Sequence, residues 1–205
     1  MATQPDLFGV PSGLPEGLGY QPDFLTRDEE AGLAEQLSAV PVTPFEFQGF
    51  LGKRRTASFG LHYAFDGGGL GEAEPIPPFL LPIRDRAARF AGLAAEALRH
   101  VLVIEYDIGA GIGWHRDRPE FDDVVGISLI APARLRFRRK RGSGWERASL
   151  MAEPGSAYLL RGPARSEWEH SIAPMDRLRY SITFRSLRGP APATGPESKP
   201  RNGDG

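Results

Sequence analysis

The sequence predicts a β-rich α+β fold of the sandwich or jelly-roll type. About eight short runs of strand character follow one another with turn residues between them. The 25 glycines and 19 prolines favour such a loop-rich chain over a helical bundle. Two earlier segments have helical periodicity, so two helices are expected to pack on one sheet. A length of 205 residues suits one domain with a core of its own.

Composition narrows the class of protein further. Cysteine is absent, which excludes disulfides, thiolate zinc sites and a cysteine nucleophile. The start at Met1 has neither the basic nor the apolar region of a signal peptide, and no apolar run is long enough to span a membrane. We therefore expect a cytoplasmic protein without membrane contact, and we expect a monomer.

Charge is nearly balanced over the whole chain, at −1, which argues against a general polyanion binder. Its distribution is uneven, because basic residues crowd one predicted hairpin. They are Arg134, Arg136, Arg138, Arg139, Lys140, Arg141 and Arg147. Of these, Arg138 and Arg139 are candidates for contact with an anionic substrate.

The N-terminal residues 1–22 are rich in Pro and Gly, lack periodicity, and are expected to form a disordered arm. Within them Gln4-Pro5-Asp6-Leu7-Phe8 resembles the short peptide with which bacterial repair and replication proteins bind the sliding clamp. Leu7 and Phe8 on such an arm need an apolar pocket on a partner, unless they pack on their own domain. Residues 188–205 are of low complexity and are expected to be a disordered tail.

Two helices are expected ahead of the main strand region. The first spans residues 24–37, where Thr26 and Glu29 form a capping box before an apolar stripe. The second spans residues 83–100, with apolar residues at helical spacing. His100 is expected to be a cation at the C-terminus of this second helix rather than a metal ligand.

Strands account for the rest of the predicted fold. Residues 41–65 are expected to hold two short strands, and residues 66–78 form a loop rich in Gly, Pro and acids. The strands expected after the second helix are 101–106, 124–130, 134–138, 145–151, 156–161 and 179–187.

Two histidines and an aspartate form the first candidate site. His115 and Asp117 are two positions apart beyond strand 101–106, so an extended chain points both to one face. His170 arrives after several more strands and completes a set of two imidazoles and one carboxylate. Such a set covers half of an octahedron and leaves open positions, which suits non-haem Fe(II) oxygenases. By itself, a His-x-Asp pair is a weak signal, because histidine is usually a packing or surface residue.

The last strand adds a second signal. Alternation along Arg179-Tyr180-Ser181-Ile182-Thr183-Phe184-Arg185 places both arginines on one face with Ser181 and Thr183. Two arginines that face an interior are costly unless they meet an anion. A small dicarboxylate is such an anion, because a guanidinium binds a carboxylate through two parallel hydrogen bonds.

Together these motifs resemble the AlkB-like Fe(II)/2-oxoglutarate dioxygenases, over about residues 45–187. The matching residues are Tyr106-Asp107-Ile108-Gly109, His115-x-Asp117, His170 and the strand from Arg179 to Arg185. The resemblance implies a double-stranded β-helix, or jelly roll, with Fe(II), 2-oxoglutarate and O2 as cofactor and co-substrates. Carried over by position, it implies His115, Asp117 and His170 as iron ligands. It implies that Arg179 and Tyr106 bind the distal carboxylate of 2-oxoglutarate, and that Arg185 lies near the keto-acid end.

Some positions depart from the family pattern. Ser181 stands among the 2-oxoglutarate contacts where the family often has Asn, and Ile104 replaces another Asn. Members that repair nucleobases can carry an Asp two residues after the metal Asp. Here that position is Pro119, followed by Glu120, which leaves the substrate class open.

The segment ahead of the catalytic core forms a lid over the substrate in this family. By position, His62 and Tyr63 are candidates for stacking on a planar substrate; the alternative is core packing. Lys53, Arg54 and Arg55 are candidates for a phosphate contact; the alternative is a solvated edge. Trp114, which precedes the first proposed ligand, is a candidate for stacking on substrate; the alternative is core packing.

The expected organisation is one domain at residues 23–187, with helices and lid at 23–100 and the jelly-roll core at 101–187. The implied activity is oxidative demethylation of alkylated bases in DNA or RNA, which releases formaldehyde, succinate and CO2. Nucleic acid is favoured by the basic hairpin, the basic triplet and the clamp-like arm. Two alternatives stay open: a protein demethylase or hydroxylase of the same family, and a non-enzymatic jelly-roll binding module with a structural metal.

Overall fold

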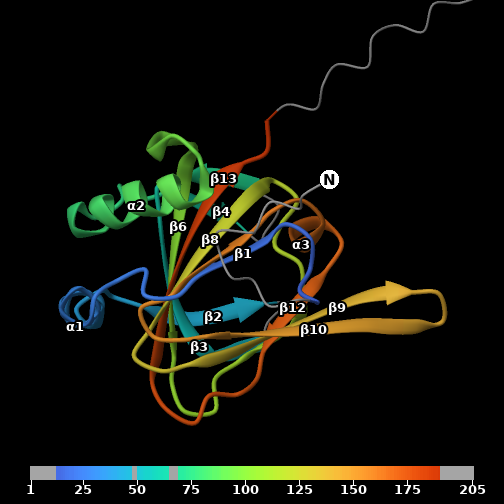
Figure 1. Ribbon diagram of the computed structural model, residues 1–205. Coiled ribbons are helices and arrows are strands. Elements are labelled where there is room, and N and C mark those ends of the chain that lie inside the picture. The colour runs from blue at the N-terminus through green and yellow to red at the C-terminus, as the bar shows by residue number, and fades with distance from the viewer. Residues whose placement is uncertain (1–12, 48–49, 65–68, 190–205) are drawn as a thin grey trace, which may run out of the picture.

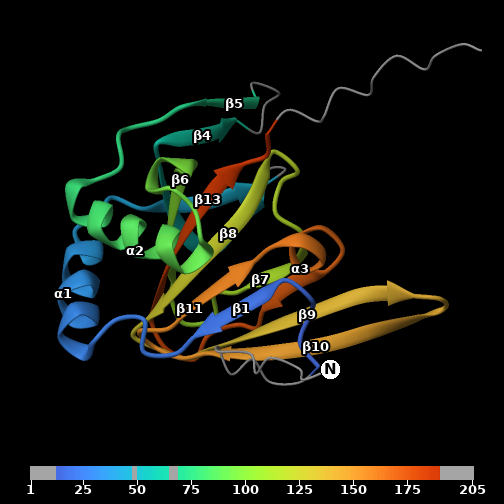
Figure 2. The same ribbon diagram turned by 45° about the horizontal axis from the view of Figure 1, so that its top comes forward.

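The computed structural model describes residues 13–47, 50–64 and 69–189, which form two main antiparallel sheets and a separate two-stranded one, with the two longer helices on one side (Figures 1 and 2). The proposed clamp peptide, Gln4 to Phe8, lies outside the described residues and stays a prediction. None of the helices within the described ranges has the length and apolar character needed to cross a bilayer.

The larger sheet has seven strands, and every neighbouring pair is antiparallel. Its order is β1 (Leu18–Gln21), β11 (Ala157–Leu160), β8 (Phe121–Leu129), β13 (Arg179–Leu187), β6 (Leu98–Tyr106), β3 (Phe50–Phe59) and β2 (Thr43–Phe47). β13 lies at the centre and all but its last residue is buried, so both of its faces must be covered. The alternation of apolar and polar residues in its sequence meets that requirement.

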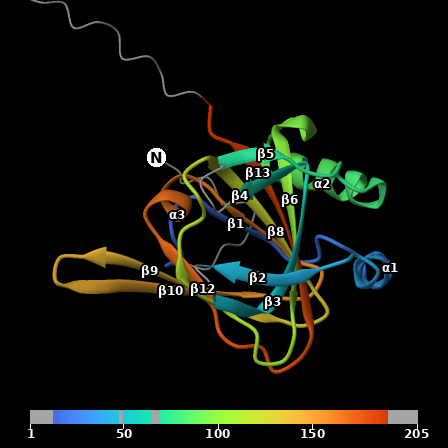
Figure 3. The same cartoon turned by 180° about the vertical axis from the view of Figure 1, so that it is seen from behind.

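The smaller sheet has four strands and lies against one face of the larger one (Figure 3). Its order is β10 (Gly144–Ala152), β9 (Ala133–Arg141), β12 (Glu169–Ile172) and β7 (Ile112–His115). β9 and β10 form a long hairpin that projects beyond the rest of the fold (Figure 2). A separate pair, β4 (Leu61–Ala64) and β5 (Gly69–Glu72), forms a two-stranded sheet. The predicted jelly roll is therefore confirmed.

Two helices cover the outer face of the larger sheet, as the sequence predicts. They are α1 (Arg27–Ser38) and α2 (Leu81–Ala91); shorter helices are η1 (Pro78–Leu80), η2 (Ala95–Ala97) and α3 (Gly162–Ser166). Leu33 and Leu37 of α1 and Ala87 of α2 share one buried cluster with Ile182 and Phe184 of β13. A second cluster fills the space between the sheets, where Leu135 and Phe137 of β9 meet Ile104 of β6. The candidate site residues predicted from the sequence, His115, Asp117 and His170, lie between the sheets as well.

The structure differs from the sequence prediction at two element boundaries. The helix expected at 83–100 is too long, because Gly92 ends α2 in a left-handed conformation with φ 66°. His100 consequently lies in β6, buried, and not at a helix end. Residues 18–21, placed in the disordered arm, form β1 on the edge of the larger sheet. Backbone pairing with β11 supplies their order, and such pairing requires no apolar periodicity.

Candidate functional site

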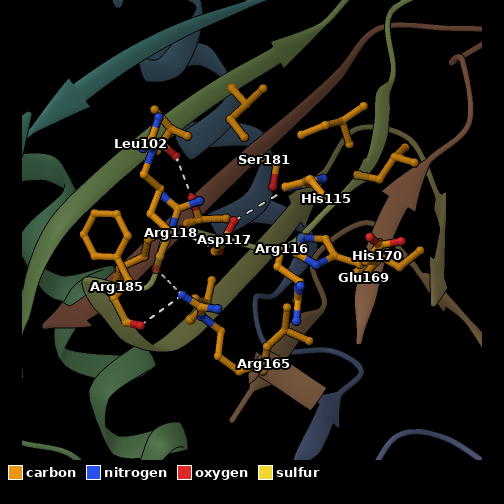
Figure 4. Close-up of a pocket in the computed structure, with 18 of the residues that line it drawn as sticks. Leu102, His115, Arg116, Asp117, Arg118, Arg165, Glu169, His170, Ser181 and Arg185 are labelled. Atoms are coloured by element: carbon orange, nitrogen blue, oxygen red, sulfur yellow. Dashed lines mark hydrogen bonds and ion pairs between the residues drawn. The ribbon is translucent and has the colours of Figure 1, made fainter. Parts of the chain in front are cut away.

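Three potential metal ligands meet between the sheets. His115 ends β7 and lies directly opposite His170 in the antiparallel register of β7 and β12, and Asp117 follows two residues after His115. The ligand atoms of these side chains all lie within 4.8 Å of one another. The two imidazole centroids are 4.2 Å apart, and Figure 4 shows His115, Asp117 and His170 on the cavity. The structure therefore brings together the three side chains that the sequence spacing proposed as ligands.

The charge state of this cluster suits metal coordination. Burial alone would raise the pKa of the Asp117 carboxyl, but Arg185 and the two imidazoles outweigh it and hold that pKa well below its usual range. Burial, followed by the nearby His115, lowers the pKa of His170 to about 3, so its imidazole is neutral near pH 7. His115 Nδ1 donates a 2.9 Å hydrogen bond to the Gly113 carbonyl, which leaves Nε2 free to ligate.

These residues fit an Fe(II) ion. Two imidazoles and one carboxylate are borderline and hard donors of the kind that iron accepts, and the set leaves further coordination positions open. Arg185 Nε donates to Asp117 Oδ2 at 3.3 Å, which fixes the carboxylate from behind. The site thus has both the ligands and a group that orients one of them.

A second centre lies around Arg179. This side chain is completely buried, its Nε donates to Ser128 Oγ at 3.1 Å, and its guanidinium stacks 5.0 Å from the Tyr106 ring centroid. Its Nη1 and Nη2 are buried and have no hydrogen-bond partner among the described residues. A buried guanidinium with two unsatisfied nitrogens is costly unless an anion binds there. The donor fork therefore fits a carboxylate, with Tyr106 and Ser181 buried nearby in the paired strands β6 and β13.

A cavity of about 1150 Å³ contains the His-Asp-His cluster and opens to solvent between the sheets. Ser181, Thr183 and Arg185 of β13 line it, while Tyr180, Ile182 and Phe184 lie in the helical layer, as the alternation predicts. Its wall is strongly basic. The charged residues that line it are Arg54, Arg116, Arg118, Arg165, Arg185 and Arg188, against Asp117 and Glu169.

The residues of the basic triplet on β3, Lys53 to Arg55, lie in different environments. Neighbours on a strand alternate in direction, so Arg54 faces the other way from Lys53 and Arg55. Arg54 faces the cavity, stacks 3.8 Å from the Phe45 ring centroid, and has no ion pair with any described carboxylate. Burial lowers its pKa. Arg55 instead pairs with buried Glu105, and Lys53 is exposed. Arg54 is thus the one member of the triplet that lines the cavity.

The other expected substrate residues are spread out. His62 and Tyr63 lie on β4, and their side chains fall outside the described residues. Trp114 is half-buried at the cavity, and Glu120 is exposed and does not line it. Arg138 pairs with Glu169 at 2.6 Å.

Arg139 points to the opposite face of the hairpin. There it binds Glu146 at 2.9 Å and Glu167 at 2.6 Å, and stacks 4.9 Å from the Trp168 ring centroid. The prediction that Arg139 contacts substrate is not supported by this position, because its donors are already occupied.

Sequence reasoning missed several residues that line the cavity. The His100 ring centroid lies 4.8 Å from that of Phe121, and His100 Nδ1 accepts a 3.3 Å hydrogen bond from Arg185 Nη1. Arg165 donates to the carbonyls of Arg118 and Phe121 and so holds the chain just after Asp117 (Figure 4). Correct strand boundaries would have identified His100, because it alternates with Leu102 and Ile104 on the cavity face of β6.

Tyr158 also lines the cavity and was not among the candidates from the sequence. The position of its ring depends on a glycine in the neighbouring strand. A Cβ on Gly126 would overlap the Tyr158 ring, so only glycine at this position of β8 lets the ring enter the cavity wall. Burial raises the pKa of Tyr158 to about 12, which keeps its hydroxyl protonated. The alternation of the predicted strand 156–161 would have placed Tyr158 with Leu160 on this face.

Comparison with known proteins gives a consistent family match. Residues 17–185 match the 2OG-Fe(II) oxygenase superfamily. The "Alkylated DNA repair protein ALKBH8 homolog" of Arabidopsis thaliana is 31% identical over 201 residues, which is 84% of this chain and 56% of that protein. The "Alpha-ketoglutarate-dependent dioxygenase alkB homolog 7, mitochondrial" of Bos taurus is 35% identical over 91 residues, or 43% of this chain and 40% of that protein. The chain therefore spans about half the length of the curated relatives it matches.

Solved structures have the same fold. The structure of OsALKBH1 aligns with a TM-score of 0.63 at 17% identity, covering 84% of this chain and 99% of that one. At this identity the likeness bears on the fold alone.

Proposed function

The chain belongs to the 2OG-Fe(II) oxygenase superfamily and is AlkB-like, and from that premise we propose that it oxidatively demethylates alkylated bases in nucleic acid. Membership implies Fe(II), 2-oxoglutarate and O2 as the reaction's cofactor and co-substrates. The products of the proposed reaction are the repaired base, formaldehyde, succinate and CO2.

We assign the iron to His115, Asp117 and His170 on the basis of their 4.8 Å grouping and their donor chemistry. When bound, the iron supplies the oxidising chemistry on O2 that no side chain can provide. The chain's own contribution is to hold the ligands in place. Arg185 orients the Asp117 carboxylate, and the Gly113 carbonyl orients the His115 ring.

We assign 2-oxoglutarate to the Arg179 centre. The unsatisfied Nη1 and Nη2 atoms can form two parallel hydrogen bonds to its distal carboxylate, with the Tyr106 hydroxyl as a further donor. Ser181 lies between Arg179 and the cavity on β13, where it can contact the co-substrate's chain. Arg185, beside Asp117, is placed to face the keto-acid end.

The charge of the cavity wall carries the nucleic-acid part of the proposal. Arginines line the cavity in excess of carboxylates, and one of the two carboxylates, Asp117, is assigned to the metal. Arg54 is half-buried and unpaired among the described residues, so an anionic group such as a phosphate would offset the cost of its burial. A methylated base that pairs poorly would enter the cavity at little unpairing cost.

A protein substrate is the second candidate. Pro119 lines the cavity where base-repairing relatives can carry an aspartate, so a donor or acceptor for a base edge is missing at that position. A methylated or hydroxylatable side chain would not require it.

One panel of substrates tests the proposal. Iron- and 2-oxoglutarate-dependent formaldehyde release is measured with methylated DNA, methylated RNA and methylated peptides, with His170→Ala as the inactive control. We expect release from at least one nucleic acid and none from the peptides. Release from peptides alone would replace the nucleic-acid proposal by the protein one, and turnover of 2-oxoglutarate with no macromolecule accepted would contradict both.

A further inference from the structure

The outward face of the β9–β10 hairpin carries a row of cations with two indole rings among them. Alternate residues of β9 face away from the core, while Leu135 and Phe137 between them are buried. We name this surface the basic strip. It consists of Arg134, Arg136, Arg138 and Lys140 on β9, Arg147 on β10, and the indoles of Trp114 and Trp145.

The two indoles hold the cations in order along the strand. The Arg138 guanidinium lies 4.5 Å from the Trp114 ring centroid and 4.3 Å from that of Trp145. Arg136 lies 5.3 Å from Trp114, and Lys140 Nζ lies 5.3 Å from Trp145. Contacts of this kind restrain long side chains that would otherwise be mobile.

The charge of the basic strip is not balanced within the described part of the chain. Glu169 is the carboxylate that pairs with it, through Arg138. Arg134, Lys140 and Arg147 are exposed and have no ion pair with any described residue. Like charges at neighbouring positions on one face of a sheet repel each other, so a bound polyanion would stabilise this arrangement.

The strip passes the candidate active site at Arg136 and Arg138. Trp114 immediately precedes His115, and Glu169 immediately precedes His170; both line the cavity as well as contacting the strip. From there β9 carries the cations toward the hairpin tip, which projects away from the body of the protein (Figure 2). A chain bound between Arg138 and the hairpin tip would therefore have one end at the cavity mouth.

We infer that the basic strip binds single-stranded nucleic acid on one side of the base that enters the cavity. The inference deepens the proposed function and rests on it. A narrow strip of cations interleaved with aromatic rings matches the combination by which proteins bind one nucleic-acid backbone and its bases. A single strand also presents an unpaired base to the cavity without the cost of opening a duplex. Arg139 and Arg141 belong to the other face of the hairpin and take no part in it.

The test compares two triple variants with the same change of charge. Arg134→Gln/Lys140→Gln/Arg147→Gln removes the exposed, unpaired cations of the strip. Arg27→Gln/Arg89→Gln/Arg99→Gln removes exposed cations from α1, α2 and the start of β6, and serves as the matched control. Fluorescence anisotropy over a salt series gives the affinity for an unmodified single strand of about 12 nucleotides. Formaldehyde release from a methylated trinucleotide is measured in parallel.

We expect the strip variant to bind the long strand at least about tenfold more weakly at low salt, and its slope of log affinity on log salt to fall by about 2. The control variant should keep the wild-type affinity and slope. Both variants should process the trinucleotide at the wild-type rate, because it is too short to extend from the cavity to Arg134, Lys140 or Arg147. Trinucleotide turnover tests the proposed function independently, so the long-strand result decides the strip even if no methylated substrate is accepted.

Two results would overturn the inference. One is an unchanged salt slope in the strip variant. The other is a duplex or a poly-glutamate peptide whose binding exceeds that of the single strand and depends equally on the strip, which would make it a duplex or a general polyanion surface.

Discussion

At the scale of single residues, the main energetic question is how the cost of burying the Arg179 charge is offset. It is fully buried, yet two of its nitrogens have no partner among the described residues. It contacts Ser128 and Tyr106 and forms no ion pair with a described carboxylate, so an arriving anion would compensate its charge. An arginine in this state favours binding of a planar carboxylate over binding of a single-point anion.

Arg179→Ala should raise the 2-oxoglutarate concentration needed for half-maximal turnover by at least about 100-fold, since loss of one partner of a buried ion pair costs about 3–5 kcal/mol. Arg179→Lys should recover only part of this loss, because an ammonium cannot form two parallel hydrogen bonds. Initial rates of 2-oxoglutarate decarboxylation over a range of concentrations measure both effects. An unchanged dependence in Arg179→Ala would place the co-substrate elsewhere.

Replacing any of the three proposed ligands should abolish iron-dependent turnover. His115→Ala, Asp117→Ala and His170→Ala each leave two donors, which is too few for the open half-octahedral site. Decarboxylation of 2-oxoglutarate is the activity measured, and circular dichroism confirms that the fold persists. Full activity in a folded variant would remove that residue from the ligand set.

These residues could be proposed from the sequence because they lie either close together in it or at a regular spacing along a strand. His115 and Asp117 share one short segment, and Arg179 belongs to a strand whose alternation is visible without a structure. Arg165 could not be found in this way. Its role depends on α3 bringing it to the carbonyls of Arg118 and Phe121, which are far away in sequence.

At the scale of elements, α1 shows how a local signal becomes a tertiary contact. Glu29 accepts from the Thr26 amide at 2.8 Å, which completes the predicted capping box. The same carboxylate pairs with Arg86 of α2 at 2.6 Å, and Arg86 also donates to the Phe24 carbonyl at 2.8 Å. The capping residue therefore also joins the two helices.

This pair predicts a pH dependence of stability. The hydrogen bond from Arg86, and then that from Thr26, lower the pKa of Glu29 to about 2 from its usual 4.5. A lowered folded-state pKa means that the contribution is complete above about pH 4.5 and is lost as the pH falls toward 2. Glu29→Gln keeps the capping acceptor but not the charge, so it should be less stable than wild type at pH 7 and approach it in acid.

Urea unfolding at several pH values measures this difference. Asp28→Asn is the matched control, because Asp28 lies in the same helical turn, is exposed, and has no ion pair with any described residue. A Glu29→Gln deficit that stays constant from neutral pH into acid would show that the pair with Arg86 contributes nothing.

Element boundaries were the weaker part of the sequence prediction. The capping box fixed the start of α1, but the alanines and leucines after Gly92 continue a helical pattern that the structure does not use. The strand pairing of β6 with β13 and β3 outweighs the local preference for helix. β1 likewise has no strand pattern in its own sequence, because its ordered conformation comes from pairing with β11.

At the scale of the whole molecule, the candidate site joins the two sheets. His115 and His170 belong to the smaller sheet, whereas Arg179, Arg185 and Tyr106 belong to the larger one. Metal and co-substrate would therefore bridge two layers that are otherwise held together by the apolar cluster between them. Ligands that bind only the folded state stabilise it in proportion to the logarithm of their concentration.

The melting temperature should consequently rise in two separable steps. Mn(II), which binds the same donor types without turnover, should raise it first, and 2-oxoglutarate should add a second increment. At about 100 times the dissociation constant each ligand contributes about 2.7 kcal/mol, which is about 5–10 °C for a domain of this size. Differential scanning calorimetry without reductant measures both steps.

Two variants assign the increments to their sites. Arg179→Met should be at least as stable as wild type without ligands, because an apolar side chain replaces an uncompensated buried charge. It should keep the metal increment and lose that of 2-oxoglutarate. Asp117→Ala should lose both, since the co-substrate completes its binding on the metal. If 2-oxoglutarate stabilised Arg179→Met as strongly as wild type, the buried guanidinium would have no part in its binding, and the proposed bridge to the larger sheet through Arg179 would be wrong.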